Sequence, residues 1–87
     1  MTTFDPNFKL DSNISRYLDY SMTITRMITE KMREEGITIK QLARMLNRRE
    51  SQVDDWLSGR QNFTLRMLAD ISVVLELDFS EAFKNET

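Results

Sequence analysis

The stretch from Thr38 to Gly59, TIKQLARMLNRRESQVDDWLSG, constrains the fold of this chain more than any other part of it. Its apolar residues fall at helical spacing on two short faces, Leu42, Ala43 and Leu46, then Val53, Trp56 and Leu57. Asn47 stands between the two faces, and asparagine tolerates the left-handed backbone conformation that ends helices. The stretch therefore predicts two short helices, over 38–46 and about 49–58, joined by a tight turn.

Residues at the helix ends support this prediction. Thr38 is followed three positions later by Gln41, which is the pattern of a capping box. Gly59 is placed to end the second helix, and the small Ala43 lets two helices cross closely. Two short helices crossing over a tight turn form a helix-turn-helix, whose second helix lies in the major groove of DNA. Trp56 shares a face with other apolar residues, so we expect it in the core.

The segment from Gly36 to Phe83 resembles the phage-repressor/Cro-like (XRE) helix-turn-helix family. The matching features are Gly36-Ile37-Thr38, Leu42-Ala43, Val53, Trp56, Ser58-Gly59 and Thr64-Leu65. The resemblance implies an all-α, lambda-repressor-like DNA-binding fold. It also implies a chain that binds double-stranded DNA as a homodimer, usually for transcriptional control.

The whole chain predicts a small bundle of about five helices with an N-terminal helical extension. We expect residues 1–20 to form the extension and 21–87 the helix-turn-helix domain. Residues 1–10 are expected to be an irregular lead-in. The helical pattern starts at about Ser12 and continues to Gly36, as one long helix or as two helices broken near Tyr20-Ser21. Beyond the motif, a helix capped by Thr64 presents the apolar stripe Leu65, Leu68, Ala69, Ile71 (or Ser72) and Leu75, and a short helix follows within 77–83.

The N-terminal extension is unusually apolar. Two hypotheses fit it: extra packing on the core, or a surface that meets a second subunit or a partner protein. The apolar residues concerned are Phe4, Phe8, Ile14, Tyr17 and Leu18.

Composition excludes several classes of function. The 87 residues contain no cysteine and no histidine, so the usual metal ligands and the commonest general base are absent, and we expect no metal and no cofactor. The adjacent carboxylates Asp54 and Asp55 point about 100° apart on a helix, which does not suit an acid–base pair, so we do not expect an enzyme. The longest apolar run, Val73 to Leu75, is far too short to span a membrane. The lack of cysteine fits a reducing cytoplasm.

The charge is unevenly distributed along the chain. The net charge is −2, but between residues 36 and 68 six basic side chains stand against three acidic ones. Residues 69–87 hold one basic side chain against five acidic ones. A basic middle between acidic flanks suits a small DNA-binding protein, and ordinary scatter of surface charge is the alternative.

The resemblance assigns candidate site residues. Candidate base-reading residues are Arg49, Glu50, Ser51 and Asp55. Candidate phosphate-binding residues are Lys40, Arg44, Arg48, Arg60, Asn62 and Thr64. Arg44 and Arg60 could instead be simply solvated, and Thr64 could serve only as a helix cap.

The chain departs from the family pattern in two respects. Ile39 stands where the family typically has a glutamine that contacts the DNA backbone. The second helix of the motif carries acidic residues that the phosphates of DNA repel, and Arg48 or Arg49 could offset them by pairing with Asp54 or Asp55. The alternative function is therefore a protein-interaction module, such as the antitoxin partner of a toxin-like protein, with weak DNA binding.

Overall fold

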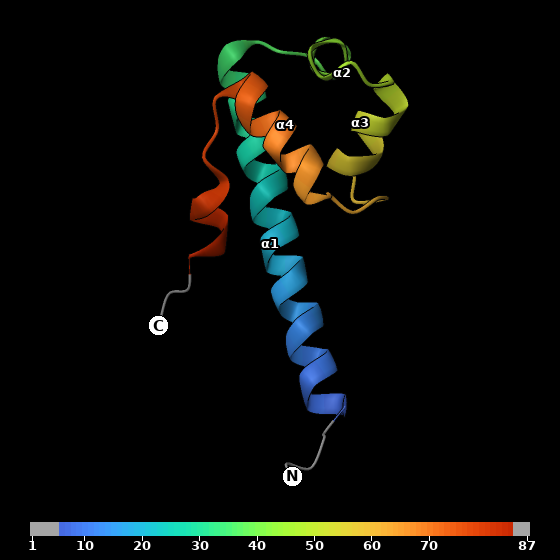
Figure 1. Ribbon diagram of the computed structural model, residues 1–87, viewed down its shortest axis with the longest axis vertical. Coiled ribbons are helices and arrows are strands. Elements are labelled where there is room, and N and C mark those ends of the chain that lie inside the picture. The colour runs from blue at the N-terminus through green and yellow to red at the C-terminus, as the bar shows by residue number, and fades with distance from the viewer. Residues whose placement is uncertain (1–5, 85–87) are drawn as a thin grey trace.

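The computed structural model describes the backbone of residues 6–84 and the side chains of residues 12–84. Within this part of the chain every regular element is helical (Figure 1). The elements are α1 (Pro6–Glu35), α2 (Ile39–Leu46), α3 (Glu50–Leu57), α4 (Leu65–Leu75) and the short 3₁₀ helix η1 (Phe79–Phe83). The predicted all-α class is confirmed, with four α-helices and one 3₁₀ turn.

Helix α1 is a single helix of 30 residues. It begins at Pro6, so the prediction of an irregular lead-in followed by a helix from about Ser12 was wrong. Proline suits the first position of a helix, because its fixed φ is helical and its missing N–H would have no partner there. No break occurs near Tyr20-Ser21. The side chains of Phe4 and Phe8 lie outside the described residues.

The core lies around the C-terminal half of α1. Ile24, Ile28 and Met32 are buried there, and Ile28 is fully enclosed. Helix α4 packs across α1, α2 packs against α3 and α4, and η1 lies along α1 (Figure 1). The other buried apolar residues are Leu42, Ala43, Leu46, Val53, Trp56, Met67, Leu68, Ile71, Leu75, Phe79 and Ala82.

Helix α4 buries Leu68, Ile71 and Leu75, as the sequence predicted, but two positions of the predicted stripe were wrong. Met67 is buried, whereas Leu65 and Ala69 are exposed. Leu65 is the first residue of α4, and helical side chains lean toward the N-terminus. Its side chain therefore projects past the end of the helix, away from the core.

The N-terminal half of α1 extends beyond the rest of the molecule (Figure 1), which measures 51 Å along its longest axis. Its apolar side chains Ile14, Tyr17, Leu18 and Met22 are between 44% and 70% exposed. The hypothesis of extra core packing is therefore wrong for these four residues. Tyr20 differs, because it packs edge-on against Phe83 of η1 with 4.8 Å between the ring centroids.

Candidate nucleic-acid interface

The first helix of the motif starts with the predicted capping box. The Thr38 hydroxyl accepts a hydrogen bond from the backbone N–H of Gln41 at 3.1 Å. The Gln41 side-chain oxygen accepts one from the Thr38 N–H at 2.8 Å. The two bonds satisfy N–H groups that the start of a helix leaves without partners.

The turn between α2 and α3 is built on Asn47. Its backbone is left-handed, with φ 57° and ψ 46°, as the sequence predicted. The N–H of Arg48 then donates to the carbonyl of Ala43 at 2.9 Å, which closes the end of α2. Helix α3 begins two residues later, where the Gln52 side chain accepts a hydrogen bond from the Arg49 N–H at 3.2 Å.

Both helices of the motif contribute to the core, and α2 also packs against α4. Val53 is 1% exposed and Trp56 is 8% exposed, so Trp56 is a core residue, as predicted. Gly59 follows the helix with φ +84°, a conformation that glycine adopts without strain. Gly59 thus ends the motif, as predicted.

The candidate base-reading residues lie along α3. Arg49, Glu50 and Ser51 are exposed at its start. Asp55 is half-buried and lies four residues after Ser51, so the two share one face of the helix. The start of α3 is therefore accessible to a ligand, and its first helical residue is acidic.

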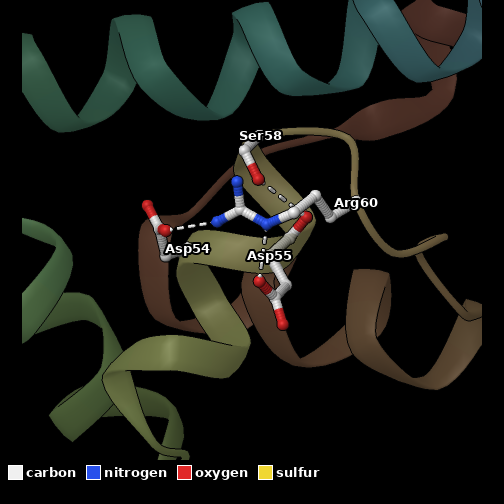
Figure 2. Close-up of polar contacts among 4 residues, drawn as sticks. All are labelled: Asp54, Asp55, Ser58 and Arg60. Carbon is white, nitrogen blue, oxygen red and sulfur yellow. Dashed lines mark hydrogen bonds and ion pairs between the residues drawn. The ribbon is translucent and has the colours of Figure 1, made fainter.

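Arg60 pairs with both acids near the end of α3 (Figure 2). Its Nη2 lies 2.7 Å from Asp54 Oδ2, and its Nε lies 3.0 Å from Asp55 Oδ1. The hydrogen bond to Asp55, with the charges of both acids, raises the pKa of Arg60 above its usual value. We call these three side chains the Arg60 clasp.

The Arg60 clasp replaces the pairing that the sequence suggested. In the described part of the chain neither Arg48 nor Arg49 takes part in an ion pair. The three side chains of the clasp together carry one net negative charge, whereas Asp54 and Asp55 alone carry two. A guanidinium has five N–H donors, and the two ion pairs occupy two of them. Arg60 therefore keeps donors for a phosphate, although the acids hold it beside α3.

Two other candidate phosphate-binding residues also have partners inside the molecule. The Tyr17 hydroxyl of α1 donates a hydrogen bond to the Asn62 side-chain oxygen, which leaves the Asn62 NH₂ group free to donate. The Thr64 hydroxyl accepts a hydrogen bond from the Met67 N–H at 3.0 Å. Thr64 is therefore a cap of α4, as predicted.

The remaining candidate cations surround α2. Lys40, Arg44 and Arg48 are exposed, and among side chains 12–84 none of the three is in an ion pair. Lys40 and Arg44 lie four residues apart, on one face of α2. Ile39 is half-buried against the core, which accounts for an apolar residue at this position.

Two further findings concern the described residues as a group. They contain no cluster of three or more histidine, cysteine, aspartate or glutamate side chains arranged to hold a metal ion. None of their helices is long and apolar enough to cross a membrane.

Comparison with known families agrees with this geometry. The family model of the Cro/C1-type helix-turn-helix DNA-binding domain matches residues 27–87. The chain belongs to this family. The match covers the C-terminal part of α1 and every later element, so the DNA-binding motif and all the buried core residues except Ile24 lie within it. No curated protein and no solved structure matches the chain.

Proposed function

We propose that the chain is a transcriptional regulator that inserts α3 into the major groove of duplex DNA. The observation that carries this proposal is the group of exposed cations without acidic partners on and after α2, beside the accessible start of α3. In helix-turn-helix proteins the first helix of the motif crosses the DNA backbone while the second contacts base edges. The phosphate-binding residues of this proposal are Lys40, Arg44 and Arg48, with Arg60, Asn62 and Thr64 beyond α3. The base-reading residues are Arg49, Glu50, Ser51 and Asp55.

The acidic residues of α3 oppose the insertion of this helix into DNA unless their charge is balanced. Phosphates repel carboxylates, and the Arg60 clasp reduces this repulsion by balancing one of the two charges. A carboxylate can also accept a hydrogen bond from the amino group of cytosine. Asp55, held in place by Arg60, would suit that contact.

We also propose that the chain acts as a homodimer. A single domain of this size contacts one half-site, and helix-turn-helix dimers bind two half-sites about 34–36 Å apart. The exposed N-terminal half of α1 supports this proposal. We assign residues 1–20 to an extension used for association and residues 21–87 to the DNA-binding domain. The buried part of α1 begins at Ile24, which supports this division.

The alternative is a protein-interaction module, such as an antitoxin that holds a toxin-like partner. The same exposed side chains of α1 favour it, since apolar patches often mark protein-binding surfaces. In that case the chain would bind DNA weakly and a purified partner tightly. A toxin-like gene beside the gene for this chain would favour the alternative.

The phosphate role of α2 can be tested with one substitution. Arg44→Ala should weaken binding to all duplex sequences alike and lower the slope of log affinity against log salt concentration by about 0.9. Fluorescence anisotropy with labelled duplexes at several salt concentrations measures both quantities. Lys31→Ala is the matched control, because Lys31 lies on α1 and pairs with Glu35 at 3.6 Å.

The control variant should bind as the unmodified chain does. If Arg44→Ala changes sequence preference and leaves the salt slope unchanged, Arg44 does not bind a phosphate. If no duplex binds the unmodified chain at low salt, the proposed function is wrong and the protein-interaction alternative remains.

A further inference from the structure

The exposed face of α1 carries an uncharged stripe along about four turns of the helix. We name it the α1 stripe, and it consists of Ile14, Leu18, Ser21, Met22, Thr25 and Thr29. Apart from the adjacent pair Ser21 and Met22, these residues follow one another at spacings of three and four, so they share one side of the helix. The Thr29 hydroxyl donates to the carbonyl of Thr25 at 2.9 Å, which satisfies that polar group within α1. The stripe is about 22 Å long from Ile14 to Thr29 at 1.5 Å per residue.

The α1 stripe forms one wall of a groove in the molecule. The other wall is the end of α3 and the turn after it, at Leu57, Ser58 and Gly59. The groove has a volume of about 440 Å³, and Tyr17 and Leu18 lie at its N-terminal end. A helix with an apolar face would fill this space.

One edge of the α1 stripe is charged in a self-complementary way. Asp19 and Arg26 are seven residues apart, so they project within about 20° of each other. Both are exposed, and no ion pair of the described side chains involves either. Ser12 and Ser15 continue the same edge toward the N-terminus. One sign of charge is therefore followed by the other along this edge.

We propose that α1 of a second copy of this chain packs antiparallel on the α1 stripe, with Met22 at the two-fold axis. This inference deepens the proposed homodimer and rests on it. In such a pair, residues equally far before and after the axis lie opposite each other, and equivalent edges face each other. Asp19 is three residues before Met22 and Arg26 is four after it, so each Asp19 lies within one residue, about 1.5 Å along the axis, of Arg26 of the other copy, which is close enough for an ion pair. A two-fold interface forms both ion pairs at once, because it buries the same patch on both subunits.

The rest of the edge also suits the antiparallel arrangement. To within one residue, Ser15 lies opposite Glu30 of the other copy and Ser12 lies opposite Arg33, so no like charges meet. On the stripe itself, again to within one residue, Leu18 faces Thr25 and Ile14 faces Thr29 of the other copy. A parallel pair would instead bring opposite edges together and would separate Asp19 from Arg26.

The absence of cysteine from the chain allows a direct test by disulfide cross-linking. A disulfide needs Cα atoms about 4.4–6.8 Å apart. Met22→Cys should form a disulfide-linked dimer under mild oxidation. Ile14→Cys should not, because in the antiparallel pair the two copies of position 14 are about 24 Å apart along the axis. Both positions are exposed, at 70% and 56%, so neither substitution disturbs the core.

Charge reversal provides an independent test on the full chain. Asp19→Arg and Arg26→Asp should each weaken self-association about tenfold, since each turns two attractive pairs into repulsive ones. The double variant should return to within about threefold of the unmodified chain. Asp70→Arg is the control for charge change away from α1, and sedimentation equilibrium measures all four variants.

The outcomes separate this inference from the proposed function. Equal cross-linking at positions 14 and 22 would indicate a parallel pair and overturn the inference. So would a monomeric chain that does not link at position 22, or a double charge reversal that fails to restore association. Anisotropy measurements on reduced protein report DNA binding separately. If the chain binds DNA but forms no disulfide at position 22, the inference alone is wrong. If it forms the disulfide but binds no DNA, the proposed function alone is wrong.

Discussion

Removing the charges of Asp54 and Asp55 should strengthen DNA binding by a calculable amount. Asn has nearly the shape of Asp but no charge, so Asp54→Asn with Asp55→Asn removes both ion pairs of Arg60. The ion pairs at 2.7 Å and 3.0 Å no longer compete with a phosphate for the guanidinium. If Arg60 then makes one full phosphate contact, the slope of log affinity against log salt concentration should steepen by about 0.9.

The slope also sets the expected gain in affinity. One additional phosphate contact steepens the slope by about 0.9. On lowering the salt tenfold, from 1 M to 0.1 M, the binding constant of the double variant should therefore rise roughly eightfold more than that of the unmodified chain. Loss of the repulsion between the carboxylates and phosphates adds to this gain. We therefore expect the double variant to bind duplex DNA about tenfold more tightly at moderate salt, which is about 1.4 kcal/mol.

Fluorescence anisotropy with one duplex at several salt concentrations measures both the affinity and the slope. The triple variant that adds Arg60→Ala is the control, and it should lose the steeper slope. An unchanged slope in the double variant would show that Arg60 does not reach a phosphate. Undetectable DNA binding in both the unmodified chain and the double variant would refute the insertion of α3 into DNA.

Two further predictions concern stability. Ile28→Ala should lower the free energy of unfolding by about 2–5 kcal/mol, because Ile28 is fully buried. Met22→Ala should change the free energy of unfolding by no more than about 0.5 kcal/mol at concentrations where the chain is monomeric. Urea unfolding of both variants measures these changes, and equal losses of stability would contradict the described core. The backbone N–H of Ser80 donates to Asp78 Oδ1 at 3.0 Å and lowers the pKa of Asp78 below 3.8. This stabilisation is complete above pH 3.8 and is lost as the pH falls through the folded pKa. The difference in the free energy of unfolding between the unmodified chain and Asp78→Asn should therefore disappear at low pH. A difference that stays constant with pH would exclude this charge effect.

Exposure along α1 explains why a helical pattern was not enough to define the core. Ile14, Leu18 and Met22 have the same spacing as Ile24 and Ile28, and the sequence could not separate them. Only the second group is buried, in the part of α1 that belongs to the core with α4. Burial depends on where other helices end, and helical periodicity carries no information on that.

The local features of the motif were determined by the sequence itself. The capping box at Thr38, the left-handed turn at Asn47 and the cap of α4 at Thr64 were all predicted and are all present. Each depends on residues no more than five positions apart, so the physical interaction is complete within the local sequence.

Only the tertiary structure decided what the charged and apolar surfaces do. The Tyr17 hydroxyl meets Asn62 across 45 positions of sequence because α1 passes the loop after α3. The sequence places two acids on α3 and several arginines near them, and charge alone does not choose among those arginines. The positive φ of Gly59 turns the chain back beside α3, and Arg60 therefore reaches Asp54 and Asp55 while Arg48 and Arg49 remain unpaired with them. Side-chain pairing depends on the path of the backbone in space, and that path is set by how the helices pack together.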